Sequence, residues 1–416
     1  MKIKAMAIAI SAVMTGSALA NEGQVPAAIA PLNHVFLIMM ENHGYSQILN
    51  NPNASFINHY ARAANLATNY YAIGHPSLTN YLEVVGGSNF GVQSDNSPDW
   101  HNARCVSNLQ SGTASTDVPA SPSICPIAGV GMDAATPAVD RVNEISNPGD
   151  VVINIDGTQA IPAAFTTGKT IADQLVAHHL TWKSYQESLP AAGADGVNLS
   201  DGVFTNSTDF TAITPSLTPP LTSGDIVSLY AAKHNPFVYF RSVQEGTARG
   251  NGLPNSVGFD GANGLYADLR AGDVPSFSFV APNQCNDQHG RGNAGAFCNF
   301  DPVSDGSQSG LNPALIIRGD QAVEKLIGAI KSSPAWEAGH NAIIVLWDEN
   351  DYSVSPNTNQ VMLIVDTNFG AHAIQSSTRY NHFSLLKTLE AGFQLPCLNH
   401  ACDANVQVMG DLFAHH

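Results

Sequence analysis

Carboxylate, amide and imidazole side chains follow three apolar runs of the sequence, either directly or within eight residues. The runs are residues 34–40 (HVFLIMM), 276–281 (SFSFVA) and 342–347 (AIIVLW). The polar residues that follow them are Glu41, Asn42, Asp287, His289, Asp348 and Glu349. An apolar run of this length fits a strand that is buried on both faces of a parallel sheet. Because such sheets bind their ligands outside the carboxyl ends of the strands, these side chains are candidates for one site.

These side chains form a donor set that suits one or two divalent cations. The oxygen donors suit Ca²⁺, Mg²⁺ or Mn²⁺. The imidazoles of His289 and of His382, which opens an expected helix, shift the preference toward Zn²⁺. Without a cation, neighbouring carboxylates would repel one another. For each group alone the alternative is a solvated loop residue or a helix cap. The sequence therefore predicts a divalent-metal site and leaves the metal open.

A hydroxyl at a tight turn completes the candidate chemistry. In residues 74–80 (GHPSLTN), Gly74 and Pro76 indicate a turn, and Ser77 or Thr79 could cap the helix that follows. The amino end of a helix stabilises an anion, and a nearby metal lowers the pKa of a hydroxyl. A serine in this place is therefore a candidate nucleophile, with an ordinary helix cap as the alternative.

Helical and strand patterns alternate along the chain that must position these groups. Helices are expected at residues 55–70, 81–85, 169–179, 311–330 and 383–393. Further strands are expected at residues 182–185, 236–240 and 361–365. Alternation of this kind predicts an α/β fold with a largely parallel sheet. Residues 91–168, which are polar and rich in Gly, Pro, Ser and Asp, are expected to form a loop-rich insertion in a single domain.

The composition restricts the partners. The chain has 416 residues, of which only 12% are charged, and its formal net charge is −17. A protein this acidic is a poor non-specific ligand for nucleic acid or anionic lipid. No stretch after the amino-terminal region has the length of a transmembrane helix. We therefore expect no nucleic-acid partner and no stable membrane anchor, and the oligomeric state is left open.

Residues 1–20 have the pattern of a secretory signal. Lys2 and Lys4 precede a short apolar stretch, and a small-residue cleavage site ends at Ala20. Cleavage there would leave residues 21–416 as the mature domain, and loss of the two lysines would change the charge from −17 to −19. The expected location is therefore secreted or periplasmic.

Export permits disulfides, and six cysteines fall into three pairs that are close in sequence. The expected bridges are Cys105–Cys125, Cys285–Cys298 and Cys397–Cys402. Six cysteines allow fifteen pairings, so proximity is only a guide. A cysteine metal site is disfavoured because no C-x-x-C spacing occurs.

Six stretches, taken in order, resemble the motifs of the secreted phosphoesterase family. That family includes bacterial and fungal acid phosphatases and bacterial phospholipases C. The stretches are ENHGY (41–45), HPSLTNYL (75–82), KHNPF (233–237), PNQCNDQHG (282–290), VLWDEN (345–350) and YNHFSLLKTLE (380–390). The resemblance covers about residues 34–393. It implies an alkaline-phosphatase-like, three-layer α/β/α sandwich with a mostly parallel central sheet.

The resemblance also implies that the metal ligands fall into two groups. Around the nucleophile the matching residues are Glu41, Asn42, Asp348 and Glu349. A second cluster binds a metal in some relatives, whereas in others its histidines bind phosphate or protonate the leaving group. The residues that match this second cluster are Asp287, His289 and His382.

The same resemblance implies a nucleophile and substrate contacts. Ser77 matches the hydroxyl nucleophile, and Asn80 matches the amide that holds a non-bridging phosphate oxygen. Many relatives have Pro directly before this Asn, where the chain has Thr79, so Thr79 is the alternative nucleophile. The other residues expected to bind substrate are Lys233, His234 and His75. The acid for the leaving group is expected among His234, His289 and His382.

These expectations combine into one function and two alternatives. The chain is expected to be a metal-dependent acid phosphatase that hydrolyses small phosphate monoesters through a phosphoserine intermediate. An imidazolium acid fits an acidic working pH, since histidine is charged below about pH 6.5. The alternatives are a phospholipase C and a non-catalytic exported protein that binds metal or phosphate.

Overall fold

The computed structural model describes most of the chain outside the expected insertion. The described residues are 22–90, 95, 168–189, 192–194 and 229–413, with gaps at 247, 292–293, 304 and 352–357, together with the backbone of 106–107 and 124–125. The expected signal peptide, most of the insertion at 91–168 and the expected bridge between Cys105 and Cys125 lie outside the described residues.

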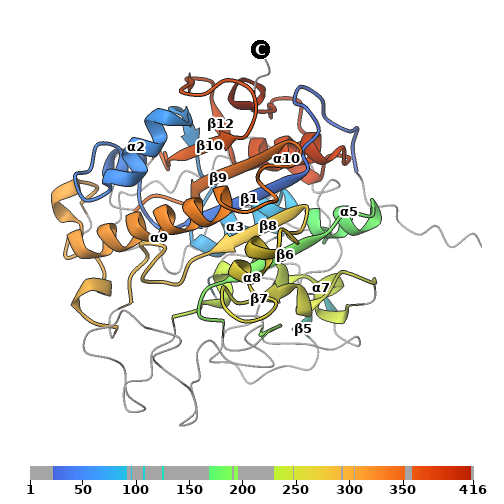
Figure 1. Cartoon of the computed structure of the whole chain (residues 1–416), viewed down its shortest axis with the longest axis horizontal. Helices are drawn as coiled ribbons and strands as arrows, with labels where there is room; N and C mark the ends of the chain where they lie inside the picture. The colour runs from blue at the N-terminus through green and yellow to red at the C-terminus, as the bar shows by residue number, and fades with distance from the viewer. Residues whose placement is uncertain are drawn as a thin grey trace, which may run out of the picture.

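An eight-stranded sheet forms the centre of the described chain (Figure 1). In spatial order its strands are β11 (Gln375–Ser376), β2 (Asn65–Ala67), β10 (Leu363–Thr367), β9 (Asn341–Trp347), β1 (His34–Met40), β8 (Phe277–Ala281), β6 (Trp182–Gln186) and β7 (Ser256–Val257). Only β10 runs against its neighbours, β2 and β9, and the other pairs in this sheet are parallel. The predicted α/β fold with a mostly parallel sheet is therefore confirmed.

The longer helices form two packed groups. In one group α2 (Ser55–Ala63) and α8 (Leu265–Ala271) contact α9 (Pro313–Lys331). In the other group α3 (Ser77–Gly86), α5 (Ile171–Ala177) and α10 (His382–Phe393) contact one another. Figure 1 shows α9 in front of the sheet and α3 behind it. The sheet therefore lies between two helical layers, as expected for a sandwich.

Short elements complete the described chain. The short helices are α1 (Tyr45–Ile48), α7 (Arg241–Glu245), η3 (Ala232–His234), η4 (Pro236–Tyr239), η5 (Leu253–Asn255), η6 (Ala296–Cys298), η7 (Gln308–Gly310), η8 (Asn399–Cys402) and η9 (Gly410–Phe413). The short strand pairs are β3 (Tyr70–Tyr71) with β12 (Tyr380–Asn381), and β4 (Val106–Ser107) with β5 (Ile124–Cys125).

The three predicted apolar runs are neighbouring strands at the centre of the sheet. β1 lies between β9 and β8, and Val35 to Met40 are completely buried. Met40 pairs with Trp347 in a parallel register, so Glu41 and Asp348 leave the sheet side by side. The backbone N–H of Glu41 donates to the carbonyl oxygen of Asp287 at 2.8 Å, which brings the loop after β8 to the same place. The three polar strand ends therefore meet at one edge.

The predictions of two elements were wrong. Residues 55–70 do not form one helix, because α2 ends at Ala63 and the chain then enters β2, which pairs with β10. Residues 236–240 do not form a strand, because Pro236–Tyr239 form the short helix η4. There the ring of Phe237 packs against the ring of Trp182, with 4.5 Å between the two ring centroids. Phe237 thus fills the core without joining the sheet. An apolar run alone does not distinguish a buried strand from a buried helical turn.

Two of the expected disulfides are confirmed. Cys285 is bonded to Cys298, and Cys397 is bonded to Cys402. The first bridge closes the loop after β8, which carries Asp287 and His289. Within the part of the chain that the structure describes, no helix has both the length and the apolar character needed to span a bilayer.

Candidate active site

Ser77 is the first residue of α3, and its hydroxyl lies among the polar groups that leave β1 and β9. Its Oγ is 3.1 Å from Glu41 Oε2 and 3.1 Å from Glu349 Oε1. It is also 3.3 Å from Asn42 Oδ1 and 3.3 Å from Lys233 Nζ. A hydroxyl has one hydrogen, so it can donate to only one of the two carboxylates. When both are ionised, the other carboxylate therefore faces the Ser77 oxygen without a hydrogen between them.

The side chain of Asn42 lies beside these carboxylates. With its amide turned so that the nitrogen faces them, it donates to Glu41 Oε2 at 3.1 Å and to Glu349 Oε1 at 3.2 Å. Its backbone N–H donates to Asp348 Oδ1 at 3.0 Å. Asp348 Oδ2 is buried and has no hydrogen-bond partner among the described residues. Buried carboxylate oxygens with so few hydrogen-bond donors are what a divalent cation would satisfy.

Four buried carboxyl groups share the site. They belong to Glu41, Asp287, Asp348 and Glu349, each at most 1% exposed. Burial raises the pKa of the Glu41 carboxyl to about 7, and burial raises the pKa of the other three well above their usual values. The positive charge of Lys233 lowers all four pKa values. One ammonium does not offset four carboxylates, so ionisation of the cluster calls for additional positive charge.

His234 lies between two of these carboxyl groups. Its Nε2 is 3.1 Å from Glu41 Oε1, and its Nδ1 is 3.2 Å from Asp287 Oδ2. Burial holds the pKa of His234 well below its usual value. A neutral imidazole has one N–H, so when both carboxyl groups are ionised, one ring nitrogen faces a carboxylate oxygen without a hydrogen between them. Glu41, His234 and His289 each offer a ligand atom within 4.8 Å of the others, so these three residues could hold a cation.

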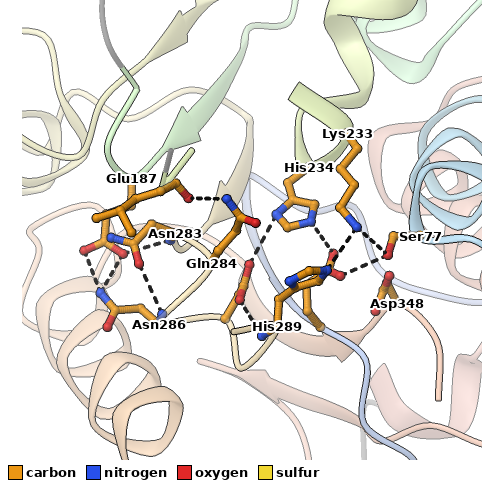
Figure 2. A network of polar contacts seen from close by, with 12 residues as sticks. Ser77, Glu187, Lys233, His234, Asn283, Gln284, Asn286, His289 and Asp348 are labelled. Carbon is orange, nitrogen blue, oxygen red and sulfur yellow. Dashed lines mark hydrogen bonds and ion pairs between the residues drawn. The ribbon is translucent and has the colours of Figure 1, made fainter. Parts of the chain in front are cut away.

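Lys233 lies between the nucleophile candidate and His289 (Figure 2). Its Nζ is 3.3 Å from Ser77 Oγ, 3.1 Å from His289 Nε2 and 2.9 Å from Asp95 Oδ2. His289 Nδ1 is 2.9 Å from the carbonyl oxygen of Gly290, so Nδ1 carries the hydrogen and Nε2 accepts from the ammonium. Burial and the charge of Lys233 lower the pKa of His289 to about 3.

Asn80 holds the turn before α3. Its Oδ1 accepts from the backbone N–H groups of Ile73 and Gly74, both at 3.1 Å. Its Nδ2 donates to the carbonyl oxygen of Gly74 at 2.8 Å and to Glu349 Oε2 at 3.1 Å. These four hydrogen bonds use the full capacity of the amide. A contact between Asn80 and phosphate stays a prediction, and it would require one of these bonds to be exchanged.

Thr79 and His75 contact groups other than the Ser77 hydroxyl. Thr79 Oγ1 donates to the carbonyl oxygen of Pro76 at 2.8 Å, as hydroxyls in the first turn of a helix commonly do. His75 Nδ1 lies 2.7 Å from Glu349 Oε2, and burial lowers the pKa of His75 to about 3. The structure thus places Ser77 among the acidic groups and Thr79 outside them.

His382 lies behind Asp348. Its Nε2 is 2.7 Å from the backbone carbonyl oxygen of Asp348, so Nε2 donates. Its Nδ1 is 3.0 Å from the hydroxyl of Tyr70 and accepts from it. Both ring nitrogens therefore form hydrogen bonds with Asp348 and Tyr70. Neither contacts Asp287 or His289, the other two residues of the expected second metal cluster. Its role as a ligand or acid stays a prediction.

Several residues that support the site had no assigned role in the sequence. His43 Nδ1 lies 2.9 Å from the carbonyl oxygen of Glu41, and its Nε2 lies 2.9 Å from Asp301 Oδ2. The ring of Tyr81 stacks on His234 with centroids 5.4 Å apart. His43 lies in the ENHGY stretch and Tyr81 in the HPSLTNYL stretch, so the resemblance to the family could have pointed to both residues. Asp301 lies in no such stretch.

Glu187 supports the loop that carries Asp287 and His289. It follows β6, and its Oε2 accepts from the backbone N–H of Asn283 at 2.9 Å. Asn286 Nδ2 donates to both carboxylate oxygens at 2.8 and 2.9 Å, as Figure 2 shows. No local pattern marks Glu187, because its partners lie almost a hundred residues away in the sequence.

Comparisons with known proteins give a family and several relatives. The model described as "Phosphoesterase family" matches residues 47–299, which is more than half of the chain. The acid phosphatase of Aspergillus fumigatus is 23% identical over 376 residues, which cover 90% of this chain and 58% of that protein. The phosphatidylinositol-3-phosphatase of Mycobacterium tuberculosis is 24% identical over 411 residues, which cover 96% of this chain and 91% of that protein. The chain thus spans about three fifths of the length of three of the fungal relatives it matches.

A solved structure gives a more distant likeness. A protein in the alkaline phosphatase superfamily from Vibrio parahaemolyticus has a TM-score of 0.41 and 12% identity, and the match covers 89% of this chain and 68% of that one.

Proposed function

Because the chain belongs to the phosphoesterase family, we propose that it hydrolyses phosphate monoesters as a metal-dependent acid phosphatase. The observation that carries the proposal is the position of Ser77. Its buried hydroxyl lies at the amino end of a helix, 3.3 Å from the ammonium of Lys233. Helix amino ends and ammonium groups both stabilise phosphate oxygens. Relatives named acid phosphatase support the same reaction.

In this proposal Ser77 acts as the nucleophile. Glu41 and Glu349 each lie 3.1 Å from its Oγ, so one of them accepts the hydroxyl hydrogen. Oγ then bonds to phosphorus as the bond from phosphorus to the leaving oxygen breaks. Lys233 stabilises the charge on the phosphate oxygens during this step. Water next attacks the phosphoserine, which releases phosphate and restores the hydroxyl.

Two overlapping groups of side chains would hold one or two divalent cations. Near the hydroxyl the proposed ligands are Glu41, Asn42, Asp348 and Glu349. Near the imidazoles the proposed ligands are Glu41, His234 and His289, with Asp287 beside them. A bound cation would neutralise the carboxylates and polarise the oxygens of the hydroxyl and of the phosphate. The oxygen donors suit Ca²⁺, Mg²⁺ or Mn²⁺, and the imidazoles favour Zn²⁺.

With a single cation bound beside Ser77 and none on the imidazoles, we assign the proton for the leaving oxygen to His289. Its pKa of about 3 keeps the ring neutral at mildly acidic pH before substrate binds. A dianionic phosphate beside the ring would raise this pKa, because a nearby negative charge favours the imidazolium. His382 is a weaker choice, since both of its nitrogens already hold hydrogen bonds inside the protein.

The test compares two hydroxyl deletions on p-nitrophenyl phosphate. Ser77→Ala should lower kcat by at least about a thousandfold, because no other described hydroxyl contacts both Glu41 and Lys233. Thr79→Ala should stay within about tenfold of the wild type. Acid quenching during turnover should trap phosphate on the peptide that contains Ser77. If Thr79→Ala abolishes turnover while Ser77→Ala retains it, the nucleophile assignment is wrong.

A second candidate substrate is a phosphate monoester on a lipid head group. It is favoured because the relative named phosphatidylinositol-3-phosphatase matches this chain over nearly its whole length. Release of phosphate from phosphatidylinositol 3-phosphate would support it, whereas release of phosphocholine from phosphatidylcholine vesicles would indicate the phospholipase C alternative. Turnover of any of these substrates would exclude a non-catalytic binding protein.

A further inference from the structure

Asp95 contacts the nucleophile helix and Lys233, although it belongs to the expected insertion and to none of the six resembling stretches. Its Oδ1 accepts from the backbone N–H of Leu78 at 3.0 Å, and its Oδ2 lies 2.9 Å from Lys233 Nζ. Its side chain is 28% exposed, and that of Lys233 is 12% exposed. The two oxygens of one carboxylate thus join two groups that flank the hydroxyl of Ser77.

The contact with Leu78 supplies a cap that the start of α3 otherwise lacks. Pro76 occupies the N-cap position and makes no side-chain cap hydrogen bond. The first N–H groups of a helix have no partner inside the helix, and an anion there is stabilised by the helix dipole. Asp95 therefore caps the nucleophile helix from a position 17 residues further along the chain.

The contact with Lys233 fixes an ammonium that would otherwise be poorly oriented. An ammonium has three hydrogens, and Lys233 Nζ has three close acceptors: Asp95 Oδ2, Ser77 Oγ and His289 Nε2. Of the three, only Asp95 carries a carboxylate, so it provides the strongest of the three hydrogen bonds. The flexible stem of a lysine has many rotamers, and loss of this partner would release the ammonium from Ser77.

We propose that Asp95 is a positioning residue for phosphoryl transfer, which ties Lys233 to the amino end of α3 and so holds the ammonium at the Ser77 hydroxyl. The inference rests on the proposed function, in which Lys233 stabilises charge at the phosphate. Asp95 acts through Lys233 and does not touch the phosphate. Its loss should therefore lower kcat more than it weakens substrate binding.

Asp95→Asn tests this proposal because Leu78 and Lys233 contact different oxygens of the carboxylate, and an amide keeps only one of the two positions as an acceptor. The variant can cap Leu78 or accept from Lys233, but it cannot do both. Its kcat on p-nitrophenyl phosphate should fall by about tenfold to a hundredfold, with KM changed by less than about threefold. Asp95→Glu keeps the charge and should recover part of the lost kcat.

A double-mutant cycle with Lys233→Met shows whether Asp95 acts through the lysine. If it does, Asp95→Asn has little further effect on kcat once Lys233 is absent. The matched control is Asp320→Asn, since Asp320 also accepts from the N–H groups at a helix start, Phe56 and Ile57 on α2. This control should leave kcat within about twofold of the wild type while lowering the melting temperature.

Three results would overturn the proposal. The first is a full, multiplicative effect of Asp95→Asn in the Lys233→Met background. The second is a loss of melting temperature with an unchanged kcat, which would make Asp95 only a helix cap. The third is a lower KM with an equal or higher kcat, which would show that Asp95 competes with phosphate. Failure of the proposed function is distinct, because the wild type would then not hydrolyse the ester, or Ser77→Ala would remain active.

Discussion

The carboxyl groups around Ser77 determine how the site responds to pH when no metal is bound. In the metal-free protein, burial raises the pKa of Glu41 from 4.5 to about 7. The folded state therefore binds this proton more tightly than the unfolded state does. Between these two pH values the contribution of Glu41 to stability falls as the pH rises. The neighbouring carboxyls have pKa values shifted in the same direction, so they add to the effect.

We predict that a chelator lowers the melting temperature more at about pH 7.5 than at about pH 5. At the lower pH, protons replace the cation on the carboxyl groups, whereas at the higher pH their charges repel one another. Thermal unfolding with and without EDTA measures the difference, and activity should disappear with the metal. Add-back of Mg²⁺, Mn²⁺, Ca²⁺ and Zn²⁺ in parallel is the control. An equal loss of melting temperature at both pH values would contradict the prediction.

His382 tests whether a histidine in a resembling stretch binds metal or supports a neighbour. Since both of its ring nitrogens are engaged by Asp348 and Tyr70, we predict that His382→Gln retains the full metal content. Its kcat should fall by about tenfold, because Asp348 loses part of its support. Elemental analysis of the purified variant decides the question. Loss of one equivalent of metal would show that His382 is a ligand.

At the scale of the elements, the loop after β8 is held by the end of β6. Glu187 binds Asn283 and Asn286, and the loop then presents Asp287 and His289 to the site. We predict that Glu187→Ala lowers kcat by about tenfold, because the loop loses its carboxylate anchor. Glu187→Gln keeps one acceptor and should lose less. Steady-state kinetics on an aryl phosphate measures both variants.

A matched control for Glu187 is Asp268, which lies on α8 and contacts the same strand, β6. Asp268 accepts from Lys183 and Tyr185 of β6 and contacts none of the groups at the Ser77 site. Asp268→Ala should therefore lower the melting temperature and leave kcat unchanged. If both alanine variants change kcat equally, β6 as a whole matters and Glu187 has no special part in positioning the loop.

At the scale of the whole molecule, charge affects which phosphate esters can be reached. The net charge of −17 repels an anionic bilayer over a distance set by the ionic strength. We predict that a lipid phosphate monoester is hydrolysed faster in zwitterionic vesicles than in vesicles that contain added anionic lipid. Phosphate release at low and high salt measures this, and the difference should shrink as salt rises. A soluble aryl phosphate, whose hydrolysis should not respond to the vesicles, is the control.

Much of the site could be predicted because strand ends are marked locally. Apolar runs that end in Glu41, Asp287 and Asp348 were expected to meet at one edge, and the parallel pairing of β1 with β9 and β8 brings them there. The hydrophobic pattern decides which runs are buried, and the geometry of a parallel sheet then places their ends together. The two local disulfides and the helices α3, α9 and α10 followed from pattern and spacing in the same way.

The sequence by itself thus determined the fold class, the acidic edge of the sheet and the candidate hydroxyls. The resemblance favoured Ser77 over Thr79, and the tertiary structure shows that the hydroxyl of Ser77 lies among the acidic groups, whereas that of Thr79 donates to the carbonyl oxygen of Pro76. Only the tertiary structure brought Asp95 and Glu187 to the site. Their partners are distant in the chain, and which partner a polar side chain meets is decided by packing, which a local pattern does not record.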